Sequence, residues 1–195
     1  QERAILIKDA NIYTVSNGVL KDADILFDKG VIKNIGKISN IDSSIEIIEA
    51  KGLNVYPSLI SMGSTIGLQE IGAVRATRDY AEVGAFNPNV RANVSYNPDS
   101  ELIPVARSNG VLIALSVPRS GRISGQSSLM MLDGWTWEDA TLKHPIGMHL
   151  FWPSMNDPKY KSKKDKKNVN EKLHQIGKID SLFNQVHAYK KLKES

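Results

Sequence analysis

The sequence predicts a mixed α and β protein, with short strands first, a strand–helix–strand unit second and a long helix at the carboxyl end. Three observations predict this fold class. Residues 4–57 alternate apolar and polar side chains in short segments that glycine turns separate. Two continuous apolar runs, 59–65 and 111–117, flank a candidate helix. Apolar residues recur at spacings of three and four over 171–193.

The amino-terminal zone, residues 1–57, contains roughly six predicted strands of about five residues each. The segments 4–8 and 11–15 precede Asn17-Gly18, which is a strong signal for a tight hairpin. The next strand pair is joined by Asp28-Lys29-Gly30, and a third pair surrounds Lys51-Gly52. Such strands form a small sheet or half of a β-sandwich.

The second zone, residues 58–156, has a different character. The apolar run at 59–65 predicts a buried strand, and residues 100–108 predict a helix that Asp99 caps and Asn109-Gly110 ends. The apolar run at 111–117 is typical of a parallel strand that is buried on both faces. This order of strand, helix and strand indicates a βαβ unit. A loop rich in glycine and serine, a strand at 128–132, a short helix and a last strand at 146–152 complete the zone.

The remaining residues predict a flexible lysine-rich insert at 157–170 and an amphipathic helix at 171–195. The segment 157–172 holds seven lysines and three acidic residues, so it accounts for the whole net charge of +4. A nucleic-acid interface usually spreads its positive charge over a face and interleaves aromatic residues, so we interpret the run 159–167 as a solvated, flexible segment. The charge therefore does not predict a nucleic-acid partner.

Composition excludes further classes. The 195 residues include no cysteine, which excludes disulfides and thiolate metal sites. No apolar run reaches the roughly 18 residues of a membrane span, so none is expected. The chain begins at Gln1 rather than Met, which favours an exported or periplasmic protein over a trimmed chain.

The junction of the first two zones resembles the amino-terminal portion of the amidohydrolase superfamily. In that family a small β-sandwich leads through a "K-G-x-x-V-x-P-G-L-I-D" stretch into the first strand of a TIM-like barrel. The matching residues are Lys51, Gly52, Val55, Pro57, Leu59 and Ile60. A second stretch is similar to the imidazolonepropionase-like branch, through Ala106, Arg107, Gly110, Val111, Gly121, Ile123, Gly125 and Gln126.

This resemblance implies a fold and an activity. It implies half of a β-sandwich followed by the first β/α units of a TIM-like barrel over residues 58–156. The activity implied is metal-dependent hydrolysis of a C–N bond in an amide or cyclic amide, usually with zinc. A complete barrel of this kind needs about 250 residues, whereas only 138 follow Pro57. We therefore expect a chain that is not competent alone and is completed by a longer chain or by a homo-oligomer.

The metal ligands implied by the resemblance are absent from this stretch. Family members carry two histidines, at i and i+2, at the end of the first barrel strand, where both side chains reach one metal. The alignment places Gly63 and Thr65 at those positions, and Ser61 at the position of an acidic residue. Glycine has no side chain and a threonine hydroxyl is a poor ligand for a divalent metal. We expect no metal site and no cofactor in this chain.

The loop 118–128 is the main candidate for ligand binding. Its glycines free backbone N–H groups, and its arginines offer guanidinium groups to an anion. The candidate residues are Arg119, Arg122, Gly125, Gln126 and Thr65. The alternative is a plain structural loop, and both interpretations stay open.

Two other groups of polar residues have simpler interpretations. We interpret Arg75, Arg78 and Asp79 as an ion-pair network, with a polar cluster beside the loop 118–128 as the alternative. His144 and His149 are five residues apart, which does not suit one helix face, so we interpret them as structural or surface residues.

The functional hypothesis is the amino-terminal part of an amidohydrolase-like hydrolase, with a small-molecule substrate that the sequence does not identify. Whether the chain is an enzyme stays open. The alternative is a non-catalytic homologue, or pseudoenzyme, that binds a ligand or acts as a scaffolding subunit. A basic surface-binding module is a third alternative.

Overall fold

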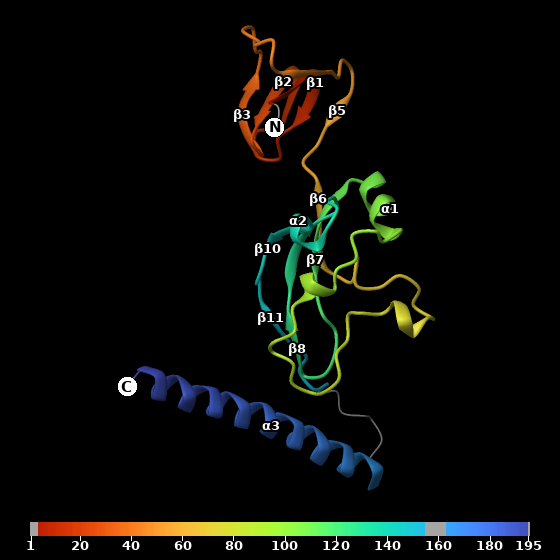
Figure 1. Ribbon diagram of the computed structural model, residues 1–195, viewed down its shortest axis with the longest axis vertical. Coiled ribbons are helices and arrows are strands. Elements are labelled where there is room, and N and C mark those ends of the chain that lie inside the picture. The colour runs from red at the N-terminus through yellow and green to blue at the C-terminus, as the bar shows by residue number, and fades with distance from the viewer. Residues whose placement is uncertain (1–3, 155–162, 195) are drawn as a thin grey trace. The chain divides into compact units, whose positions relative to one another are not determined.

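The computed structural model describes residues 4–154 and 163–194, which form the elements drawn in Figure 1. The chain divides into two compact units, Gln1–Ser58 and Leu59–Ser195, here called unit 1 and unit 2. Each unit has its own hydrophobic core. No helix of the described part is long and apolar enough to cross a membrane.

Unit 1 is a five-stranded sheet in which the strand order is β3-β2-β1-β4, and β5 also pairs with β1. The strands are β1 (Ile5–Tyr13), β2 (Val19–Asp28), β3 (Val31–Gly36), β4 (Glu46–Glu49) and β5 (Asn54–Val55). The first three pair antiparallel, whereas β4 and β5 run parallel to β1. The core is small, because three of its five members are alanines: Ala10, Ile12, Ala23, Ile25 and Ala50.

The first strand corrects the sequence-based expectation. Residues 4–8 and 11–15 were expected to be separate strands, but β1 is continuous and shows register shifts between Ile7 and Ala10 and between Ala10 and Ile12. Asp9 has a φ of 55° at this point. A bulge of this kind bends a strand without ending it. The described part of unit 1 therefore has five strands rather than six.

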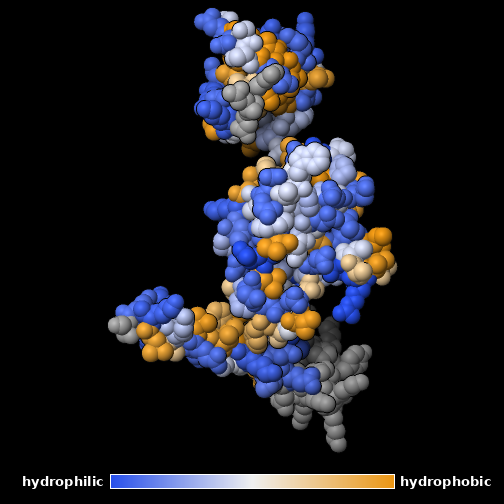
Figure 2. All heavy atoms as spheres, viewed as in Figure 1, coloured by the Kyte–Doolittle hydropathy of each residue, from blue (hydrophilic) through white to orange (hydrophobic). Residues whose placement is uncertain are grey.

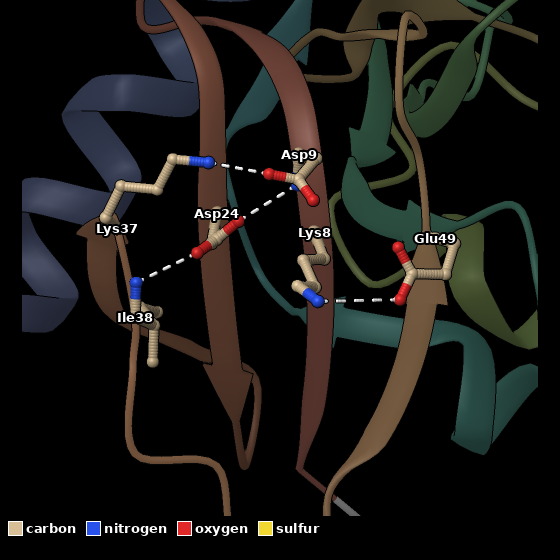
Figure 3. Close-up of polar contacts among 6 residues, drawn as sticks. All are labelled: Lys8, Asp9, Asp24, Lys37, Ile38 and Glu49. Atoms are coloured by element: carbon tan, nitrogen blue, oxygen red, sulfur yellow. Dashed lines mark hydrogen bonds and ion pairs between the residues drawn. The ribbon is translucent and has the colours of Figure 1, made fainter.

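A buried carboxylate fixes this bulge. Asp24 of β2 is only 2% exposed. Its two oxygens accept hydrogen bonds from the backbone N–H of Asp9, at 2.9 Å, and of Ile38, at 2.8 Å, as Figure 3 shows. Lys37 forms an ion pair with the Asp9 carboxylate at 2.6 Å. Lys8 and Glu49 form a longer one at 3.8 Å. The Asp24 carboxylate thus joins the bulge of β1 to the segment that follows β3.

Unit 2 contains a four-stranded sheet in the order β10-β9-β7-β6 and a separate pair, β11-β8. The strands are β6 (Leu59–Ser64), β7 (Val111–Ser116), β8 (Ile123–Gln126), β9 (Ser128–Met131), β10 (Thr141–Lys143) and β11 (Met148–Leu150). The helices are α1 (Leu102–Ser108), α2 (Trp137–Ala140) and α3 (Lys163–Glu194), with 3-10 turns at Arg75–Thr77 and Ala92–Ser95. The core contains Tyr96, Ile103, Ala114, Met130, Leu132 and Ala140.

The predicted strand–helix–strand unit is present. β6 and β7 pair in parallel, and α1 lies between them in the chain. The helix cap differs from the prediction: the Asp99 side chain does not cap α1, and Ser100 Oγ instead accepts a hydrogen bond from the Leu102 N–H at 3.3 Å. Because β9 runs antiparallel to β7, the sheet is mixed. The TIM-like barrel implied by the resemblance stays a prediction.

Two further expectations about unit 2 are wrong. β6 is not a buried strand: Leu59, Ile60 and Met62 are 61%, 52% and 71% exposed, because β6 lies at the end of its sheet and, among the described residues, pairs with β7 alone. The loop at 118–128 is not wholly irregular, since residues 123–126 form β8, which pairs with β11. Ile123, Ser124 and Gly125 are buried there, so packing makes a strand of a glycine- and serine-rich segment.

The carboxyl-terminal helix is longer than expected. α3 begins at Lys163 rather than at the predicted Glu171, so 163–170 is helical. Lysine is a good helix former, and extending an existing helix costs little. The rest of the predicted flexible insert, 157–162, lies outside the described residues. Ile179 of α3 is 2% exposed, whereas Phe183 and Val186 are both 55% exposed. Hydrophobic residues are accordingly visible on the surface of α3 in Figure 2.

Candidate functional site at the end of β6

The carboxyl end of β6 is held tightly to the end of β7. Val117 donates its backbone N–H to the Ser64 carbonyl at 2.9 Å. The buried Ser116 hydroxyl donates to the Ile66 carbonyl at 3.1 Å, and Ser64 Oγ accepts from the Ile66 N–H at 3.0 Å. Both polar groups of the Ile66 backbone are thus satisfied by serine side chains. The turn after β6 has a defined shape, and Thr65 lies within it.

Two glycines in this stretch differ in their surroundings, although their φ angles are nearly equal. Gly67 has a φ of +76°, and a Cβ at this position would lie 2.3 Å from two carbon atoms of the Tyr96 ring. Gly63 has a φ of +75°, but a Cβ there would meet no atom within 4 Å. Gly67 is therefore required by packing against the core. Gly63 borders open space at the end of the strand.

Of the two arginines predicted to bind a ligand, Arg119 contacts β6. Its Nη2 donates to the Gly63 carbonyl at 2.5 Å, and its backbone N–H donates to the Tyr80 carbonyl at 2.6 Å. The residue follows β7 by a few positions, so the parallel pairing of β6 and β7 brings it to this end of the sheet. The structure therefore places Arg119 and Thr65, two of the five predicted ligand-binding residues, at the end of β6.

The other three candidates make contacts within the chain. Arg122 donates to the Phe151 carbonyl at 3.4 Å through Nη1 and to Gln175 of α3 through Nη2. Gln126 donates to the Pro88 carbonyl at 2.9 Å. Gly125 is buried, and a Cβ there would lie 2.7 Å from the Val90 carbonyl oxygen. These contacts support the structural interpretation for this part of the loop, and their role in ligand binding stays a prediction.

The polar segment 75–79 does not form the predicted ion-pair network. These residues belong to the described part of the chain, and none of its ion pairs includes Arg75, Arg78 or Asp79. Arg78 instead forms an isolated antiparallel bridge with Gln69, and Asp79 donates its backbone N–H to the Leu68 carbonyl at 2.8 Å. The Nε atom of Arg78 is buried and has no hydrogen-bond partner. A guanidinium group without a carboxylate partner thus lies close to this segment's backbone.

His144 and His149 make no common site. His144 Nδ1 lies 2.9 Å from the hydroxyl of the fully buried Ser128, which also accepts from the Asn93 N–H at 3.1 Å. Burial lowers the pKa of His149 on β11. Sequence analysis missed the contact of Asn93, Ser128 and His144, because no local pattern links three residues so far apart in the chain. Ser128 is enclosed, so we interpret this contact as structural.

The donor set at the end of β6 does not suit a catalytic metal. It consists of a backbone carbonyl, a threonine hydroxyl and a guanidinium group, and the last of these repels cations. Within the described residues, no group of three or more histidine, aspartate or glutamate side chains could hold a metal ion. The arrangement instead offers N–H donors and positive charge, which suit an oxyanion.

The fold defines the class of protein. A small β-sheet unit followed directly by a parallel strand–helix–strand unit is the arrangement that the resemblance to amidohydrolases implies. The chain is similar to the crystal structure of an amidohydrolase from Thermotoga maritima MSB8, with a TM-score of 0.82 and 25% sequence identity. That match covers 97% of this chain and 49% of the other.

A sequence comparison agrees with the structural one. A stretch of 58 residues is 38% identical to the dihydroorotase of Carboxydothermus hydrogenoformans, and it covers 30% of this chain and 13% of that enzyme. No family model matches the sequence. The chain belongs to the amidohydrolase superfamily, and it spans about half the length of the Thermotoga maritima protein. The assignment to the imidazolonepropionase-like branch stays a prediction.

Proposed function

We propose that this chain is the scaffold portion of an amidohydrolase-type hydrolase and does not itself hold a catalytic metal. It contributes the small β-domain and the first β/α units of a TIM-like barrel. The activity of the intact protein would be hydrolysis of a C–N bond in an amide or cyclic amide, with metal ligands from outside this chain. The observation that carries the proposal is the end of β6, where the Arg119 guanidinium donates to the Gly63 carbonyl and Thr65 follows in the turn.

The chemistry of these side chains supports the proposal. A hydrolytic metal needs several nitrogen or carboxylate ligands around one point, and it lowers the pKa of a bound water only in such a cage. Gly63 offers no side chain, and its carbonyl already accepts a hydrogen bond from Arg119. The fixed positive charge of that arginine opposes the approach of a second cation.

Metal analysis of the purified chain tests the proposal. We expect well under one equivalent of zinc after incubation with zinc and gel filtration. The double variant Gly63→His, Thr65→His should still not hydrolyse amide substrates, because two histidines are too few ligands. Stoichiometric zinc in the unmodified chain, lost when Thr65 is replaced by valine, would overturn the proposal.

The alternative function, a non-catalytic scaffolding subunit, is favoured by the free edge of β6. Within residues 4–154 and 163–194 this strand pairs on one side only, and its exposed residues include no charge, which is the pattern that favours pairing with another strand. The occupant would be a strand from a longer chain or a second copy in a homo-oligomer.

Sedimentation at micromolar concentration, with mass spectrometry of the same sample, tests this alternative. We expect association that weakens at least tenfold in Met62→Lys, because Met62 is 71% exposed on β6. Val83→Lys is the control, because Val83 is 84% exposed in a loop. A stable monomer of 21.6 kDa with cooperative unfolding would contradict the alternative.

A further inference from the structure

We propose that the end of β6 carries a binding site for a small oxyanion, a carboxylate or a phosphate, formed by the guanidinium groups of Arg119 and Arg78. This inference depends on the proposed function in one respect: the end of β6 must hold no metal ion. It differs from the predicted loop site, because Arg122, Gly125 and Gln126 take no part in it.

The Arg119 guanidinium is positioned but not neutralised. Of its five N–H donors, the structure uses one, on Nη2, for the Gly63 carbonyl. Within the described part of the chain, no carboxylate lies at ion-pair distance from Arg119. The side chain is exposed. The bond to Gly63 limits its freedom before any ligand arrives, which lowers the entropic cost of binding. The remaining donors form the planar fork that fits two oxygens of a carboxylate or phosphate.

Arg78 supplies a second cationic group in the same neighbourhood. Tyr80, whose carbonyl accepts the Arg119 backbone N–H, is two residues further along the chain. Two extended residues span at most about 7 Å, and hydrogen-bonded backbones lie roughly 5 Å apart. The two arginines therefore leave the backbone within reach of a common ligand. The buried, unpaired Nε of Arg78 is a donor that lacks an acceptor, and such a group is costly unless an acceptor is supplied.

The surroundings leave room for a ligand, and among the described residues no acidic side chain pairs with these two arginines in its place. The space beside Gly63 is open, since a Cβ there would meet nothing within 4 Å. The Thr65 hydroxyl adds a neutral donor in the turn that follows. Asp79 is the nearest acidic residue in sequence, and it is exposed and forms no ion pair in the structure. An oxyanion would thus meet two uncompensated guanidinium groups.

The test is a titration of the full chain with inorganic phosphate, and separately with succinate, at constant ionic strength. Backbone amide shifts of ¹⁵N-labelled protein report the position of binding. We expect saturable shifts at residues 64–66 and 119–120. Arg119→Gln should weaken binding at least tenfold and Arg78→Gln at least threefold. Arg107→Gln is the control, because Arg107 pairs with Asp133 at 3.4 Å, and it should bind like the parent.

Several outcomes decide the proposal. Saturation by either anion that depends on Arg119 and Arg78 supports it, and the stronger anion identifies the class of ligand. Shifts that never saturate, or that survive in Arg119→Gln, overturn it. Arg119→Lys keeps the charge without the fork, so it should retain the fold and show intermediate affinity. Zinc content is measured on the same sample, so zinc without loss of phosphate binding would count against the proposed function alone.

Discussion

The Asp24 carboxylate of unit 1 gives a sharp test of the structure through the substitution Asp24→Asn. This side chain is 2% exposed and accepts two backbone hydrogen bonds, from Asp9 and Ile38 (Figure 3). An asparagine has almost the same shape but offers one acceptor oxygen instead of two. Its amide nitrogen would face one of the two N–H donors, so one backbone N–H would lose its partner.

The magnitude follows from these contacts. Leaving a buried donor without a partner costs about 1–3 kcal/mol, and more where the lost bond involved a charged group. We therefore expect Asp24→Asn to reduce the free energy of unfolding of unit 1 by about 2–3 kcal/mol. Asp24→Ala removes both bonds and should cost about 3–5 kcal/mol. A loss of 1.4 kcal/mol corresponds to a tenfold change in an equilibrium constant, so the population of open unit 1 should rise roughly 30- to 150-fold in Asp24→Asn.

Hydrogen exchange followed by mass spectrometry measures this effect. The slowest amides of β1 and β2 should lose protection by that factor. All three tryptophans lie in unit 2, so unfolding followed by tryptophan fluorescence should be unchanged and serves as an internal control. Asp22→Asn is the matched variant, because Asp22 is exposed on the same strand. If Asp24→Asn exchanges within threefold of the parent, the carboxylate does not fix the bulge and our reasoning is refuted.

Three further predictions concern backbone and pH. Gly67→Ala should destabilise unit 2 by at least about 2 kcal/mol more than Gly63→Ala, because the two glycines share their φ and only Gly67 contacts Tyr96; urea unfolding by tryptophan fluorescence compares them. The hydrogen bond from Lys37 lowers the pKa of Asp9, so their pair stabilises unit 1 above about pH 4 and this contribution is lost as the pH falls. Lys37→Gln should therefore show a smaller acid-induced loss of amide protection. Burial raises the pKa of Tyr96 to about 12, so stability should fall between about pH 10 and 12, and Tyr96→Phe should remove that part of the fall.

Local chemistry in the sequence predicted the features that depend on neighbouring residues. The turn between β2 and β3 places Lys29 and Gly30 at φ values of 50° and 71°, as a two-residue hairpin turn requires. Asn109-Gly110 ends α1, and Gly110 has a φ of 82°. The parallel pairing of β6 with β7 followed from the order of strand, helix and strand. In the two turns the responsible residues are close together in the chain, whereas the β6–β7 pairing was predicted from the order of the elements.

The features that sequence analysis missed depend on distant residues. Arg119 bonds to Gly63 across 56 positions, and Asn93 bonds to Ser128 across 35. Neither contact leaves a periodic or spaced pattern in the sequence. β8 was missed for a related reason, because its glycine and serines favour a loop, and only pairing with β11 and burial make them a strand. The burial of β6 was overestimated because apolar composition does not show how many neighbouring strands are present.

The end of β6 supports our expectation that replacing Gly63 and Thr65 by histidines would not restore a metal site. A divalent cation held by a histidine at position 63 would approach the Arg119 guanidinium, which donates to the Gly63 carbonyl, and we take about 5 Å as the separation, within the range at which neighbouring charges act on one another. At that distance the repulsion between charges of +2 and +1 is about 2 kcal/mol with the screening of water and about 7 kcal/mol at an effective dielectric constant of 20. Gly63 also has a φ of +75°, which costs a histidine about 1–3 kcal/mol. The glycine at position 63 and the Arg119 guanidinium on its carbonyl therefore both disfavour metal binding. A metal would need Arg119 to move away from Gly63, whereas an oxyanion would bind the Arg119 guanidinium in the position that it already has.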